Sequence, residues 1–302
     1  MDQEGLPSPS NPLGMEGVEF IEYSTREPLA LGALLQQFGF HPIARHRSRE
    51  VMLYRQGDMN VIVDAHPEAV RESSRGEAAT IGAIALRVRD AAFAHRRALE
   101  LGAWGMPTRA AAMELLIPGV HGPGDSLIYF VDRHQDFSIY DVDFVPLPGA
   151  DRAPPALTGL HWFGLVQSVQ VERSADWIDF YRVLVGFDPI PRGQYFGVLP
   201  KGTLLRSPDG SFYFQLVEPP EGADFVDWSE SYLRVGLGTP DVLATVAALQ
   251  SRGIVFVDRE PLRPSAKGAV TQIYLGGVAI ELVVSEDATH GAIAATKRKA
   301  AS

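Results

Sequence analysis

Glu281 and Arg234 are the charged residues of the second half whose surroundings point to chemistry. Glu281 lies in the apolar run 278–283, and a continuous apolar run predicts a strand covered on both faces. A buried carboxylate requires a cation or a proton. Arg234, in the predicted strand 232–237, supplies a guanidinium that bonds strongly to carboxylates. The pattern favours an internal charged pair, while an exposed strand edge for Glu281 and a surface site for Arg234 remain open alternatives.

The elements that must position this pair occur twice along the chain. The predicted strand 81–88 leads through Asp90, a residue type that caps helices, into an alanine-rich helix. The strand 232–237 leads through Asp241 into a second helix, and the two aspartates are 151 residues apart. This spacing is too long for a solenoid repeat and predicts a duplicated domain.

Other elements of the two halves also match. Helical stretches that end at Gly39 and Gly186 lie 147 residues apart. Each half then ends in a predicted pair of strands, at 127–132 with 138–145 and at 272–275 with 278–284. Gly276 and Gly277 predict a tight hairpin in the second pair, because glycine accepts the positive φ of such turns. We expect four parts: a flexible leader at 1–14, an N-terminal domain at 15–148, a C-terminal domain with the ligand cavity at 156–286, and a disordered tail at 287–302.

The composition excludes several classes of protein. The formal net charge of -10 speaks against nucleic acid and against an anionic membrane surface, and favours a small-molecule partner. The absence of cysteine excludes disulfides, thiolate metal sites and cysteine nucleophiles. No apolar run approaches the roughly 18 residues of a membrane span, and the first residues lack the features of a secretion signal. We expect a cytoplasmic protein, with a homo-oligomer as a compatible state.

Several segments of the first half carry a family resemblance. The segment 17–23, the triplet His46, Arg47 and Ser48, the segment 53–57 and the segment 139–145 resemble bacterial 4-hydroxyphenylpyruvate dioxygenases. That family belongs to the vicinal oxygen chelate superfamily, and the resemblance extends over about residues 11 to 285. It implies an α+β fold made of two tandem vicinal-oxygen-chelate, glyoxalase-like domains of paired βαβββ modules.

The resemblance also implies where a metal would bind. In this family the C-terminal half holds Fe(II) through two histidines and a glutamate, and three such ligands leave one face open for substrate and oxygen. The glutamate falls on Glu281 and the second histidine on Arg234. The first histidine falls on Gly164, or on Trp162 if the following loop is longer. His161 is close by, but the alternation of a strand points it away from both positions unless a bulge intervenes.

Two further positions follow from the same resemblance. Gln272 corresponds to a glutamine that contacts substrate in the family. In the N-terminal half the positions equivalent to the triad read Glu19, Ala83 and Tyr129, so we expect no metal there.

These expectations lead to three functional hypotheses. In the first, the C-terminal cavity uses no cofactor and binds a small acidic or aromatic ligand, or carries altered chemistry, with Arg234, Glu281, Gln272, Gly164 and Trp162 around the ligand. In the second, the protein is an active Fe(II) dioxygenase acting on 4-hydroxyphenylpyruvate or a related aromatic 2-oxo acid in tyrosine catabolism, with Glu281, His161 and a third ligand holding the iron. In the third, it is a subunit or pseudoenzyme partner of another protein.

Overall fold

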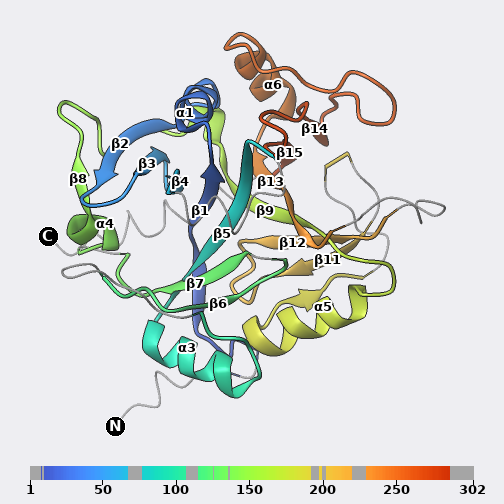
Figure 1. Cartoon of the computed structure of the whole chain (residues 1–302). Coiled ribbons are helices and arrows are strands. Elements are labelled where there is room, and N and C mark those ends of the chain that lie inside the picture. Colours follow the sequence, from blue (N-terminus) through green and yellow to red (C-terminus); the bar gives the residue numbers. More distant parts are fainter. Residues whose placement is uncertain are drawn as a thin grey trace, which may run out of the picture.

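The computed structural model describes residues 8, 10–66, 77–106, 115–124, 126–134, 137–191, 197–198, 202–219 and 229–285. Within them, the chain forms two mixed sheets, one built from each half (Figure 1). The first has the order β6-β7-β5-β1-β4-β3-β2-β8, and the second has the order β10-β11-β12-β9-β13-β15-β14. When the second order is read backwards, it repeats the first strand for strand apart from β8. The predicted α+β fold with two glyoxalase-like modules is confirmed.

The strands and helices have the following bounds. The N-terminal half contains β1 (Met15–Thr25), α1 (Pro28–Gln37), β2 (His41–His46), β3 (Val51–Gln56), β4 (Met59–Asp64), β5 (Ala79–Val88), α3 (Ala91–Glu100), β6 (Gly119–His121), β7 (Leu127–Val131), α4 (Ile139–Asp143) and β8 (Phe144–Pro146). The C-terminal half contains η1 (Leu157–Gly159), β9 (His161–Ser168), α5 (Ser174–Phe180), the π-helical η2 (Tyr181–Val185), β10 (Asp188–Pro189), β11 (Thr203–Arg206), β12 (Tyr213–Val217), β13 (Ser231–Thr239), α6 (Val242–Gln250), β14 (Gly268–Val270) and β15 (Ile280–Val284).

The helices α3 and α6 begin where their capping residues predict. The Asp90 carboxylate accepts a hydrogen bond of 2.7 Å from the Phe93 amide at the start of α3. The Asp241 carboxylate accepts one of 2.9 Å from the Ala244 amide at the start of α6. Both satisfy an amide that a helix N-terminus would otherwise leave unpaired. Figure 1 shows α1 and α6 together at one end of the molecule and α3 and α5 at the other.

The two central strand pairs share a bulge, which makes the modules comparable residue by residue. Between β1 and β5, Val18 faces Leu86 and Phe20 faces Ala85, so Glu19 is an extra residue. Between β9 and β13, Trp162 faces Leu237 and Gly164 faces Gly236, so Phe163 is the extra residue. Such a bulge places two consecutive side chains opposite one partner and offsets the alternation of the strand.

The shared bulge corrects one expected equivalence. Gly164 faces Gly236, and the residue 151 positions before Gly236 is Ala85, which faces Phe20. Phe20 therefore occupies the N-terminal position equivalent to Gly164. The expected Glu19 is the equivalent of Phe163, because both are the extra residue of their bulge.

The two halves are joined by one hydrophobic core. It runs from α1 and β1, with Ile21 and Phe38, to Tyr181, Phe214 and Leu237 of the C-terminal half, all at most 2% exposed. A smaller core, formed by Phe20, Leu53, Ile62 and neighbours, lies on the other face of the N-terminal sheet. Each sheet thus packs one face into the shared core and curls its other face around its own cavity.

Three segments differ from the prediction. Residues 138–145 form a helical turn followed by β8, because a capping box between Ser138 and Asp141 favours the helix over the strand alternation. Residues 272–275 make a single bridge through Tyr274 to Val278, and β14 takes the place beside β15. Leu13 of the predicted leader is 1% exposed and belongs to the core. The predicted tail lies outside the described residues.

No helix among the residues described combines the length and apolar character that crossing a bilayer requires.

Candidate functional site

Glu281 and Arg234 form a direct ion pair on the concave face of the C-terminal sheet. The Arg234 Nε atom donates to Glu281 Oε2 at 2.9 Å, and the two side chains are 14% and 4% exposed. Glu281 reaches this position from β15, where it faces Gly236 of β13. Arg234 lies two residues before Gly236 on the same strand. The sheet register thus brings the two predicted residues together.

The second oxygen of Glu281 is held by a loop that the sequence did not identify. The Val198 amide donates to Glu281 Oε1 at 3.2 Å, and Gly197, at φ 70°, rests against the same oxygen. A side chain at Gly197 would overlap the carboxylate. The contact joins residues 83 positions apart, so no local sequence pattern marks it. Both carboxylate oxygens therefore have donors.

Gly164, the predicted place of the first metal histidine, has no space for a side chain. A Cβ atom there would overlap the main-chain carbonyl oxygen of Tyr213, which belongs to the neighbouring parallel strand β12. Backbone cannot swing aside as a flexible side chain can. Gly164 therefore shapes the floor of the site and contributes no polar group of its own beyond the main chain.

His161 lies on the same face of the sheet as Gly164 and Glu281, because the bulge at Phe163 offsets the alternation. Its imidazole is engaged elsewhere: Nε2 lies 3.0 Å from Ser285 Oγ, and Nδ1 lies 3.0 Å from the Gly159 carbonyl oxygen. Ser285 follows Glu281 by four residues, which is roughly 13 Å of extended chain. Two ligands of one transition metal must each approach it to about 2 Å. The structure does not bring His161 and Glu281 into that range.

The two remaining predicted residues lie away from the ion pair. Trp162 faces Leu237 on the core side of the sheet, and its ring lies 6.3 Å from that of Phe40. Gln272 is exposed, and its main-chain amide bonds the Val255 carbonyl oxygen. Neither side chain lines the space next to Glu281.

A small cavity adjoins the Glu281 side of the ion pair. Its volume is about 30 Å³, which suits one or two water molecules. The described residues around it include Phe163, Tyr213 and Gln215 as well as Gly164 and Glu281. The rings of Phe163 and Tyr213 stack with centroids 4.8 Å apart, so aromatic side chains form part of the cavity wall.

The donor set at this site does not fit the iron triad that the family resemblance implies. The glutamate is present but bonded to a guanidinium, the second position is a cation, and the third has no side chain. A guanidinium offers donors only and cannot ligate a metal. Across the described ranges, no group of three or more His, Cys, Asp or Glu residues is placed to share a metal ion.

Comparison with known proteins gives the relationship of the whole chain. The family profile described as "Hydroxyphenylpyruvate dioxygenase, HPPD, N-terminal" matches residues 10–145. A 4-hydroxyphenylpyruvate dioxygenase from Pseudomonas sp. (strain P.J. 874) is 35% identical over 265 residues, which are 83% of this chain and 73% of that protein. The protein named Hemolysin VllY from Vibrio vulnificus is also 35% identical, over 82% of this chain and 73% of its own length.

A solved structure agrees with this relationship at the level of the fold. A fusion protein of a xylose isomerase-like TIM barrel and a 4-hydroxyphenylpyruvate dioxygenase matches with a TM-score of 0.71 at 21% identity. The match covers 98% of this chain and 54% of the fusion protein. On the strength of the sequence identities, the chain belongs to the 4-hydroxyphenylpyruvate dioxygenase family.

Proposed function

We propose that this member of the 4-hydroxyphenylpyruvate dioxygenase family holds a guanidinium in place of iron and binds a small carboxylic acid in its C-terminal module. The observation that carries the proposal is the bond between Arg234 Nε and Glu281 Oε2, at 2.9 Å and largely shielded from water. A charged side chain in this position supplies the positive charge that a buried glutamate needs. The proposal includes a cytoplasmic setting, which fits an acidic protein without cysteine.

The ligand class follows from the donors of Arg234. Its Nε atom is used by Glu281, so the terminal nitrogens are the donors that an incoming carboxylate would reach. A planar carboxylate matches the fork of a guanidinium. The stacked rings of Phe163 and Tyr213 favour a ligand whose other end is flat and apolar. Phenylpyruvate and 4-hydroxyphenylpyruvate have this shape, once the small cavity beside Glu281 widens to admit them.

The test combines metal analysis with ligand binding. Protein purified anaerobically with added Fe(II) is expected to hold far less than one iron per chain and to bind phenylpyruvate in calorimetry. Arg234→Met is expected to weaken binding about tenfold or more, because it removes the charge that meets the carboxylate. Arg87→Met is the matched control, since it removes the cation of the N-terminal Glu19 ion pair and leaves the C-terminal site intact.

The second candidate is the iron-dependent dioxygenase, which the activity named for the Pseudomonas relative favours. Iron content and oxygen consumption of the same anaerobic preparation decide between the two candidates. One iron per chain that is lost in Glu281→Gln, together with oxygen consumption that requires 4-hydroxyphenylpyruvate, would establish the dioxygenase and refute the proposal. Equal binding of phenylpyruvate by the wild type and Arg234→Met would refute it as well.

A further inference from the structure

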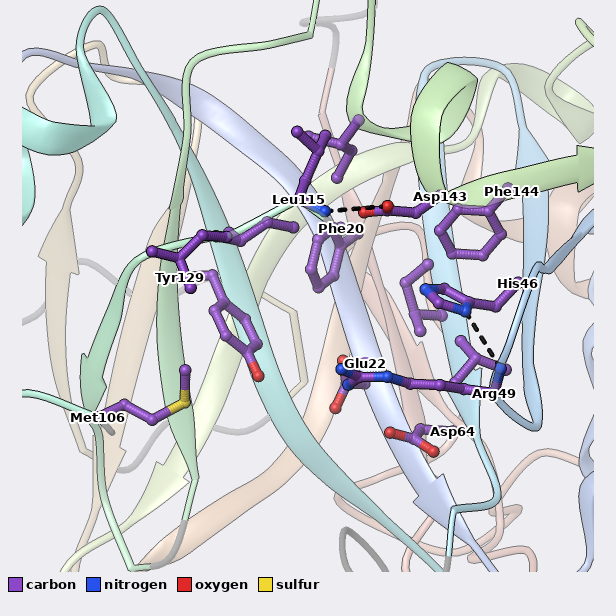
Figure 2. A pocket seen from close by; sticks show the side chains of 15 residues that line it. Phe20, Glu22, His46, Arg49, Asp64, Met106, Leu115, Tyr129, Asp143 and Phe144 are labelled. Carbon is purple, nitrogen blue, oxygen red and sulfur yellow. Dashed lines mark hydrogen bonds between the residues drawn. The ribbon is translucent and has the colours of Figure 1, made fainter. Parts of the chain in front are cut away.

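A second cavity lies in the N-terminal module and is larger than the one beside Glu281. It has a volume of about 160 Å³ and lies against the first sheet. Part of its wall is apolar, formed by Phe20 and Ile62 on the sheet, Tyr129 on β7, and Leu115 and Phe144 on the segments that cross the face. Figure 2 shows Tyr129 on one wall and Phe144 with His46 on the opposite one. An apolar cavity of about 150 Å³ is large enough to bind a benzene ring.

This cavity is the N-terminal counterpart of the C-terminal site. Tyr129 faces Ala85 in the parallel pair of β5 and β7, as Glu281 faces Gly236 in the pair of β13 and β15. Phe20 stands at the position of Gly164, as the shared bulge requires. Two aromatic rings, with centroids 6.1 Å apart, therefore replace a carboxylate and a glycine. The same place in the fold thus carries aromatic rings and adjoins a larger cavity.

One end of the cavity is polar and holds more acidic than basic side chains. Glu22 of β1 and Asp64 of β4 lie there, with Arg49 and His46 from the neighbouring loop and strand. Figure 2 shows the Arg49 side chain extending alongside Glu22, with Asp64 beside them. Asp143 also lines the cavity, where its carboxylate accepts a hydrogen bond of 3.1 Å from the Leu115 amide. Among the lining residues, three carboxyl groups thus face one guanidinium and one imidazole.

The two carboxyl groups at the polar end hold their protons tightly. Burial, followed by the nearby charge of Asp64, raises the pKa of Glu22 to about 8. Burial also raises the pKa of Asp64. A second cation would relieve both effects, because an opposite charge within a few ångströms favours the ionised form of a carboxyl group.

We propose that this cavity binds a small organic cation made of one ring and one protonated amine. The ring would occupy the apolar part between Phe20, Ile62 and Tyr129, and the ammonium group would face Glu22 and Asp64. The faces of Phe20 and Tyr129 add attraction for a nearby cation. The proposal is independent of the C-terminal function, because it uses none of the residues of that site and takes a ligand of opposite charge.

Calorimetry with three probes of the same size tests the charge of the ligand. Benzylamine is the cationic probe, toluene the neutral one and benzoate the anionic one, each titrated into the full chain. We expect benzylamine to bind at least tenfold more tightly than toluene, and benzoate to bind most weakly. Absence of benzylamine binding at millimolar concentration would overturn the proposal, and so would tighter binding of benzoate.

Variants locate the site. Glu22→Gln and Asp64→Asn keep the size of each side chain and remove its charge, and each is expected to weaken benzylamine binding about tenfold while sparing toluene. Glu16→Gln, on the same strand but 41% exposed and outside the cavity, is the matched control and should bind as the wild type does. Equal affinity in Glu22→Gln, Asp64→Asn and the wild type would place the amine elsewhere and refute the assignment.

Discussion

Gly197 and Glu281 are in direct contact, so a loop backbone closes the site over the carboxylate that the sheet presents. The neighbouring Val198 amide donates to Glu281 Oε1 at 3.2 Å, and Arg234 holds Oε2 at 2.9 Å. The carboxylate is therefore fixed from two sides, by a side chain of the sheet and by the main chain of the loop.

A methyl group at Gly197 is expected to displace this loop. Gly197→Ala would overlap the Glu281 carboxylate and would also place an alanine at φ 70°, so we expect a loss of about 2–3 kcal/mol of unfolding free energy. Gly210→Ala is the control, because Gly210 has φ 77° and no atom near its missing Cβ. It should lose only the roughly 1 kcal/mol of backbone strain. Urea denaturation measures both, and equal losses would show that the carboxylate contact contributes nothing.

Removing the cation of the ion pair should destabilise the protein more than removing both charges. Arg234→Met leaves the buried Glu281 carboxylate without its partner, and we expect a loss of about 3–5 kcal/mol. The double variant Arg234→Met with Glu281→Gln has no uncompensated charge and should recover most of that loss. Denaturation at neutral pH checks the order, and an equally unstable double variant would contradict the account.

Stability should fall as the pH rises toward mildly alkaline values. Glu22 has a raised pKa of about 8 in the folded protein and an ordinary value of 4.5, so folding binds a proton between these values and stability is lost as the pH rises through them. Asp64, whose pKa is also raised, acts in the same direction. The positive charge of Arg49 lowers both pKa values, and His66 and His46 lower that of Asp64, but burial outweighs them. We expect the unfolding free energy to drop by on the order of 1–4 kcal/mol between about pH 5 and pH 8.

The variant Glu22→Gln tests the origin of that pH dependence. Glutamine resembles the protonated glutamate and does not titrate, so the variant should lose less stability over the same range and exceed the wild type near pH 8. Glu16→Gln, on the same strand outside the cavity, should keep the wild-type slope. Parallel slopes in the wild type and Glu22→Gln would show that Glu22 does not carry the effect.

At the floor of the C-terminal site, we expect a side chain to be tolerated at Gly236 of β13 but not at Gly164 of β9. Gly164→Ala would overlap the Tyr213 carbonyl oxygen, whereas the nearest atoms to a methyl at Gly236, its partner across the pair, lie 3.4 Å away. We expect Gly164→Ala to cost about 1–3 kcal/mol and Gly236→Ala clearly less. Thermal denaturation of the two variants decides this. If Gly164→Ala is as stable as Gly236→Ala, the Tyr213 carbonyl oxygen does not exclude a side chain at this position.

The ion pair could be anticipated from the sequence, because a glutamate inside a continuous apolar run must be buried and must find a cation. The same argument applies to Glu22, which stands between Ile21 and Tyr23 and could have drawn attention to the N-terminal cavity. The cavity itself was not predictable. Its polar end collects Glu22, Asp64 and Arg49 from three separate segments, and only the sheet order brings them together.

The orientation of His161 shows why other details of the site could not be predicted. Simple alternation places its side chain on the other face of the sheet from Gly164, whereas the extra residue Phe163 puts both on the same face. A bulge has no unambiguous mark in a single sequence. The separation of His161 and Glu281 could not be predicted either, because it depends on the hydrogen bonds of His161 to Ser285 and Gly159. Helix caps such as Asp90 and Asp241 were found because their signal is local.

The bulges at Glu19 and Phe163 give each module one extra side chain that has no partner residue on the neighbouring strand. Glu19 uses the position for an ion pair with Arg87, and Phe163 uses it for a ring stacked on Tyr213. The ladder on either side is the same in both modules. Duplicated halves of a protein can therefore diverge at this one residue, from charged to aromatic, without any other strand having to move.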